Sequence, residues 1–65
     1  MNVLINDTPH TLPDGATLAD AITALAAVPP YAAAVNHAFV PRSIHAAHVL
    51  RPDDRIEVIR PVTGG

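Results

Sequence analysis

The chain has to fold without covalent cross-links, because its 65 residues include no cysteine. Neither a disulfide nor a thiolate metal site can stabilise it, and no thiol can act as a nucleophile. A chain of this length buries only about 60% of the surface that its unfolded form exposes, so one small core has to supply the stability. Hydrophobic residues make up 49% of the sequence, and Tyr31 and Phe39 are its only aromatics. We therefore expect one domain over residues 1–65, built on an aliphatic core.

The charges argue against a nucleic-acid-binding protein. The net charge is −2, with four arginines, no lysine and no cluster of basic residues. The first residues lack the basic and apolar segments of a secretory signal, and no apolar run approaches the roughly 20 residues of a membrane span. We expect a cytoplasmic protein that has no nucleic-acid or membrane partner.

The first twelve residues predict a β-hairpin. Residues 3–5 are apolar, Asn6-Asp7 favours a turn, and residues 8–12 form a second extended segment. Because Pro9 has no backbone N–H to donate, its strand should lie at a sheet edge.

A helix is predicted next. Residues 13–15 predict a turn, and Thr17 is a candidate N-cap with Asp20 three residues later, a variant of the capping box. One apolar stripe is formed by Leu18, Ala21, Ile22 and Leu25. We expect a helix of about ten residues that Pro29-Pro30 terminates.

The second half predicts three short strands. Residues 32–36 and 39–40 are extended candidates joined by a turn at Asn36-His37. Ser43 is expected to cap a single helical turn within residues 44–50, and residues 51–54 predict another turn. The clearest strand covers residues 55–60, before Pro61.

This order of elements predicts an α+β domain with one mixed sheet of about five strands and one helix across one face. That arrangement is a β-grasp, or ubiquitin-like, fold. The first and last strands are expected to be parallel neighbours in the middle of the sheet, because both are nearly continuous apolar runs.

The most informative segment is residues 61–65, which we expect to form a flexible C-terminal tail. Gly64 and Gly65 have no Cβ, so they can pass through a narrow channel of another protein. Fully extended, the five residues reach about 17 Å. A carboxylate must be activated before it can carry a group, and the chain has neither a phosphate-binding glycine loop nor a nucleophile for that purpose. A separate enzyme must activate it, unless the glycines are an ordinary terminus.

Several segments together resemble the ThiS family of sulfur carriers in thiamin biosynthesis. They are Ile5-Asn6-Asp7, Thr17-Leu18, Ala34-Val35-Asn36, Val40-Pro41-Arg42, Asp53-Asp54-Arg55-Ile56 and Gly64-Gly65. The resemblance implies a carrier, not an enzyme, that binds no cofactor of its own. An E1-like enzyme of the ThiF type would use ATP to adenylate Gly65, and a sulfur donor such as a cysteine desulfurase would supply sulfur. The resulting thiocarboxylate would pass its sulfur to thiazole synthase of the ThiG type.

The residues around the tail are the candidate partner contacts. In the carrier interpretation Gly64 allows the chain end to reach the partner's active site, and Val62 and Thr63 line the partner's channel. Arg60 lies directly before the tail. Arg42 is the second charged residue that we expect to contact a partner. Ile59 is expected on the sheet face opposite the helix, where it would form part of an exposed patch.

Other functions stay open at this point. The tail also resembles that of MoaD, the small subunit of molybdopterin synthase, and a non-covalent ubiquitin-like binding module would need no tail chemistry. His45 and His48 have a spacing that could place two metal ligands together, but without a third ligand nearby surface histidines are favoured and no metal site is predicted. Asp53-Asp54 is expected to stabilise a turn through local hydrogen bonds.

Overall fold

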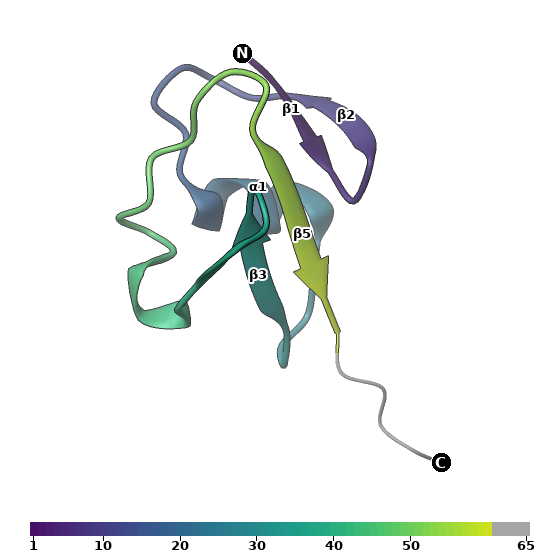
Figure 1. The fold of residues 1–65 in the computed structure, drawn as a ribbon, viewed down its shortest axis with the longest axis vertical. Coiled ribbons are helices and arrows are strands. Elements are labelled where there is room, and N and C mark those ends of the chain that lie inside the picture. The colour runs from purple at the N-terminus through teal and green to yellow at the C-terminus, as the bar shows by residue number, and fades with distance from the viewer. Residues whose placement is uncertain (61–65) are drawn as a thin grey trace.

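The computed structural model describes residues 1–60, in which five strands form one mixed sheet (Figure 1). The strands are β1 (Asn2–Ile5), β2 (Thr8–Thr11), β3 (Ala32–Val35), β4 (Ala38–Val40) and β5 (Arg55–Ile59), in the spatial order β2-β1-β5-β3-β4. β5 pairs parallel to β1 and antiparallel to β3, so the last strand lies at the centre. The predicted β-grasp architecture is confirmed. Residues 61–65, the predicted tail, lie outside the described residues.

Two tight hairpins flank the central strand. Asn6 and Asp7 have φ angles of 49° and 65°, and Asn36 and His37 have φ angles of 50° and 69°. Two consecutive positive φ angles are typical of the two-residue turn whose twist matches that of paired strands, and Asn tolerates this conformation best after glycine. Both predicted turns are confirmed. β2, with Pro9, is an edge strand as expected.

The helix α1 (Leu18–Leu25) begins where the sequence predicts. The Thr17 side chain accepts a hydrogen bond from the Asp20 N–H (3.3 Å), and the Asp20 carboxylate accepts one from the Thr17 N–H (2.8 Å). The prediction that the double proline ends the helix is wrong. Ala26 adopts a left-handed conformation with φ of 57° and donates its N–H to the Thr23 carbonyl (3.0 Å), which ends the helix four residues earlier.

The segment after β4 also differs from its prediction. A 3-10 turn, η1 (Arg42–Ile44), begins directly after Pro41, which serves as its N-cap without any side-chain hydrogen bond. Ser43 therefore lies inside the turn and does not cap it.

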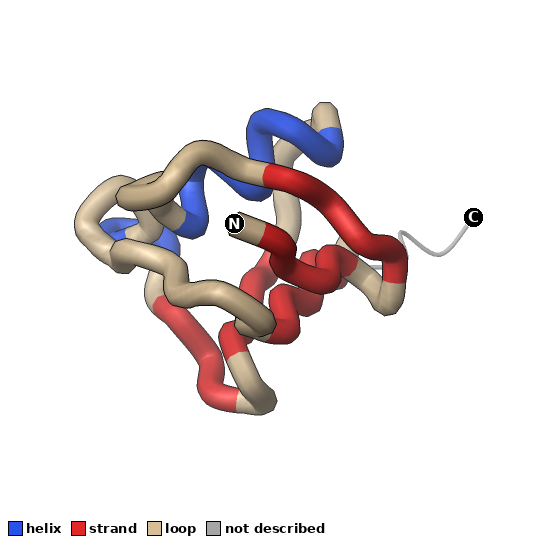
Figure 2. Tube along the Cα trace, turned by 90° about the horizontal axis from the view of Figure 1, so that it is seen from above, coloured by secondary structure: helices blue, strands red, loops and turns tan. Residues whose placement is uncertain are grey.

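The helix covers one face of the sheet, and Figure 2 shows it to one side of the strands. The core between the two layers contains Val3, Ile5, Leu18, Ala21, Ile22, Ala33, Val35, Val40, Ile56 and Val58, with Leu12, Ala16 and Leu50 closing its ends. Within each central strand only alternate residues are buried. The apolar runs of β1 and β5 therefore do not reflect burial on both faces, because no second layer within residues 1–60 covers the other side.

Candidate functional site

The site begins at the end of β5, because this strand leads directly into residues 61–65. Hydrogen bonds from both neighbours hold it, and the Asn6 side chain adds two more. Its Oδ1 accepts from the Val58 N–H (2.9 Å), and its Nδ2 donates to the Val58 carbonyl (3.3 Å). The last described residue, Arg60, is exposed and follows two positions after this bridge. The point at which the chain leaves the sheet is therefore fixed by the fold.

The sheet face opposite the helix, here called the open face, carries an apolar patch beside this point. The register pairs Ala32 with Ile59 and Ala34 with Phe39, and all four belong to the alternation that faces away from the core. Phe39 is 68% exposed and Ile59 is 58% exposed. Exposed apolar side chains that adjoin one another are typical of protein interaction surfaces. We call these four residues the apolar patch.

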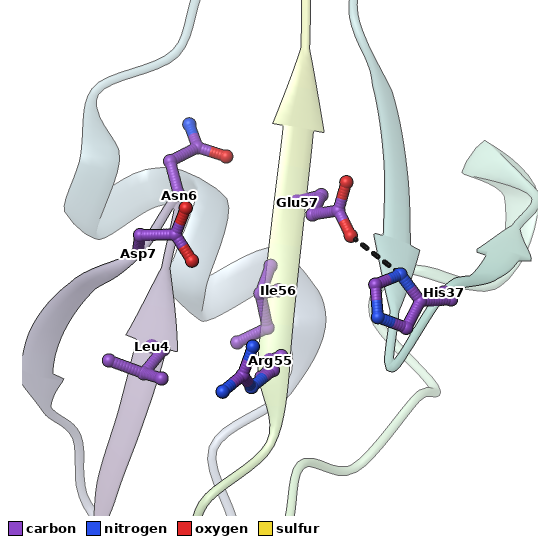
Figure 3. A pocket seen from close by; sticks show the side chains of 7 residues that line it. All are labelled: Leu4, Asn6, Asp7, His37, Arg55, Ile56 and Glu57. Atoms are coloured by element: carbon purple, nitrogen blue, oxygen red, sulfur yellow. Dashed lines mark ion pairs between the residues drawn. The ribbon is translucent and has the colours of Figure 1, made fainter.

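The open face also carries a recess, whose lining side chains are drawn in Figure 3. A recess of about 440 Å³ is lined by Leu4, Asn6, Asp7, His37, Arg55, Ile56 and Glu57. His37 Nδ1 lies 3.2 Å from Glu57 Oε1 across the neighbouring strands. The recess thus mixes both signs of charge, and no group of three metal-ligating side chains occurs in residues 1–60.

Arg42 lies in η1, and a buried histidine holds this turn in place. His45 is 5% exposed, and its Nε2–H donates to the Val40 carbonyl (2.9 Å). Its ring stacks on Tyr31 with centroids 6.2 Å apart, and its backbone N–H donates to the Arg42 carbonyl (3.3 Å). The expectation that His45 is a surface histidine is therefore wrong: its ring joins β4, η1 and the start of β3.

Asp53 and Asp54 are turn residues, as expected. The Asp54 carboxylate accepts hydrogen bonds from the Arg51 N–H (2.8 Å) and from Asn36 Nδ2 (3.0 Å). Asp53 adopts a φ of 68° in the turn before β5. Both carboxylates lie just before β5, at the opposite end of this strand from Arg60.

The structure brings together only part of the predicted site. Ile59 is on the open face as expected, and Arg60 and Arg42 are both exposed. The remaining predicted residues, Val62, Thr63, Gly64 and Gly65, lie outside the described residues. The sequence analysis did not identify Phe39 as a surface contact residue. Its position directly before the core residue Val40 in a strand indicates that its side chain points to the opposite face.

A mixed five-stranded sheet with a single helix across one face defines the class: a β-grasp domain of the ubiquitin-like kind. Its sequence matches the model of the ThiS family over residues 3–65, so the chain belongs to the ThiS family. No curated protein matches it with significance. A crystal structure of the thiamine biosynthesis protein (ThiS) from Geobacter metallireducens is similar, with a TM-score of 0.82, 20% identity and all of both chains covered. Family membership supports a role as a sulfur carrier in thiamin biosynthesis.

None of the helices in residues 1–60 is long and apolar enough to cross a membrane.

Proposed function

We propose that this chain carries sulfur for thiazole formation on the carboxylate of Gly65, and that partner enzymes supply all of the catalysis. The observation that supports this proposal most is the position of β5. The central strand of a ThiS-family fold ends at Ile59, five residues before Gly64, and is held at Val58 by its pairing with Ala33 of β3 and by the Asn6 side chain.

The first step is activation of the carboxylate by an E1-like enzyme of the ThiF type. A Gly65 carboxylate oxygen attacks the α-phosphorus of ATP and expels pyrophosphate, which leaves an acyl-adenylate. The glycines suit this step because neither has a Cβ that would block a narrow channel. Val62 and Thr63 line the channel wall, and Gly64 passes through it.

The second step replaces the adenylate with sulfur. Hydrosulfide attacks the Gly65 carbonyl carbon and expels AMP; where the donor is the persulfide of a cysteine desulfurase, its outer sulfur attacks instead, and a second thiol then reduces the resulting acyl disulfide. The product is a C-terminal thiocarboxylate, which thiazole synthase of the ThiG type then consumes. The described part of the chain offers no phosphate-binding glycine loop, so ATP binds to the partner.

Intact mass tests the proposal directly. The chain is incubated with its ThiF-type enzyme, Mg²⁺, ATP and sodium sulfide, and should gain about 16 Da as one oxygen is replaced by sulfur. The reaction should also release one AMP per chain. A variant that lacks Gly65 should show neither change, whereas Arg51→Gln, at the other end of β5, should react like the unaltered chain.

The alternatives give different results once thiazole synthase is added to the same reaction. A non-covalent binding module would bind its partner with no change in mass, and deletion of Gly65 would not affect it. A carrier of the MoaD type would form the thiocarboxylate but would not pass its sulfur to thiazole synthase.

A further inference from the structure

Two arginines lie at the end of the sheet from which residues 61–65 depart. The register pairs Ala33 with Val40 on one side and with Val58 on the other, so these two residues are level across β3. Arg42 and Arg60 each follow two positions later. Strands are spaced about 4.8 Å apart, which separates β4 and β5 by roughly 10 Å. In Figure 1 the end of β5 and the turn after β4 lie at the same end of the molecule.

This basic pair, Arg42 and Arg60, is not neutralised within the described part of the chain. The ion pairs of residues 1–60 are Met1–Asp14 and His37–Glu57, and neither includes an arginine. Both side chains are exposed. Two acidic residues line the recess on the open face: Glu57, whose carboxylate lies 3.2 Å from His37 Nδ1, and Asp7 in the turn after β1. In a chain of net charge −2, this end carries two of four cations.

The fold holds the backbone that carries both arginines. Arg60 follows the Asn6 bridge to Val58, and Arg42 lies in a turn that the buried His45 ties to Val40 and Tyr31. Groups held in position before association lose less conformational freedom on binding than groups on mobile segments. The two points from which the arginine side chains extend are therefore set before any partner binds.

The length of the tail determines what must meet this surface. Five residues reach at most about 17 Å, so an active site that acts on Gly65 has its entrance close to Arg60. The rim of that entrance has to contact Ile59, Arg60 and the neighbouring end of β4. Opposite charges across such a rim accelerate association and fix the orientation of the two partners.

We propose that the entrance to the activating enzyme's channel carries an acidic rim that pairs with Arg42 and Arg60, while the apolar patch packs beside it. This inference rests on the proposed carrier function. By pairing with both arginines, the acidic rim allows only one rotation of the domain about the axis of the tail. The carboxylate therefore enters the channel in one orientation. His45 acts as a positioning residue because it holds the turn that carries Arg42.

The test measures ATP–pyrophosphate exchange by the purified ThiF-type enzyme with the full chain as the varied substrate. Arg42→Gln and Arg60→Gln should each raise KM at least about fivefold at low salt, with kcat unchanged, because they weaken association and leave the reacting carboxylate intact. Arg51→Gln removes the same charge at the opposite end and should leave KM unchanged. The difference in KM should shrink as salt rises, since screening weakens exposed charge pairs.

Two outcomes would overturn the inference: equal KM values for the three variants, or a KM increase that does not depend on salt. Thermal unfolding of each variant verifies that the fold persists. A complete lack of exchange with the unaltered chain would instead contradict the carrier function itself, so the two failures are distinguishable.

Discussion

The two faces of the sheet are built from the same strands and yet differ in almost every respect. In β5, Ile56 is 1% exposed beneath the helix, whereas Ile59, three residues later, is 58% exposed on the open face. The covered face consists of aliphatic residues in contact with Leu18 and Ile22. The open face combines the apolar patch with a recess that contains the His37–Glu57 ion pair. One face contributes stability and the other is available for association.

This difference shows how a chain of 65 residues can both fold stably and present a surface for partner binding. Side chains alternate between faces along a strand, so each strand can contribute separately to the core and to the surface. A substitution on one face should therefore affect stability, and a substitution on the other should affect partner binding. The predictions below test that separation, from the largest expected effect to the smallest.

Ile56→Ala should cost about 2–5 kcal/mol of unfolding free energy, because it removes buried methyl groups and leaves a cavity. A domain of this size has a total stability of about 3–10 kcal/mol, so much of the chain should be unfolded. Chemical denaturation followed by circular dichroism measures the change. Ile59→Ala is the matched control, and a loss as large as that of Ile56→Ala would contradict the assignment of the two faces.

His45→Ala should cost about 1–3 kcal/mol, because the buried Val40 carbonyl loses its hydrogen bond from Nε2. The same denaturation experiment applies, with the exposed His37→Ala as the control. If His45→Ala and His37→Ala have the same unfolding free energy, the buried His45 ring does not stabilise the turn η1. His45→Ala should also raise KM for the activating enzyme by loosening Arg42, which a purely structural role elsewhere would not do.

Phe39→Ser should leave stability nearly unchanged and raise KM for the activating enzyme about tenfold, because an exposed aromatic side chain at an interface is a typical binding hot spot. Pyrophosphate exchange gives the KM, and Thr11→Ser on the distant β2 serves as the control. An unaltered KM would show that the activating enzyme does not contact the apolar patch.

Glu57→Gln should change the unfolding free energy by less than about 0.5 kcal/mol, because the exposed ion pair with His37 gains little in water. Thermal unfolding at low and high salt measures it. A larger loss of unfolding free energy would mean that the recess contributes to stability. It would contradict the assignment of stability to the covered face alone.

The sequence predicted both tight turns, the capped start of α1 and the parallel pairing of the end strands. The turns and the cap depend on residues adjacent in the chain, whereas the parallel pairing follows from the order of elements, since the apolar runs of β1 and β5 are buried on one face only. The prediction failed at the ends of two elements. The helix ends at Leu25 because Ala26 turns left-handed, and nothing local marks that alanine. Ser43 does not cap its turn because Pro41 already begins it.

The candidate site divides in the same way. By itself the sequence determined the family resemblance, the glycines that allow close passage and the positions of Arg42, Arg60 and Ile59 along the chain. Only the tertiary structure decided that Val40 and Val58, each two residues before an arginine, lie level across β3, that Phe39 and Ile59 border neighbouring alanines of β3, and that His45 is buried. The first two relations depend on strand register across β3. The Asn36-His37 turn sets the register of β3 with β4, but the pairing of β3 with β5 joins segments distant in the chain and is set by the packing of their buried side chains against the helix.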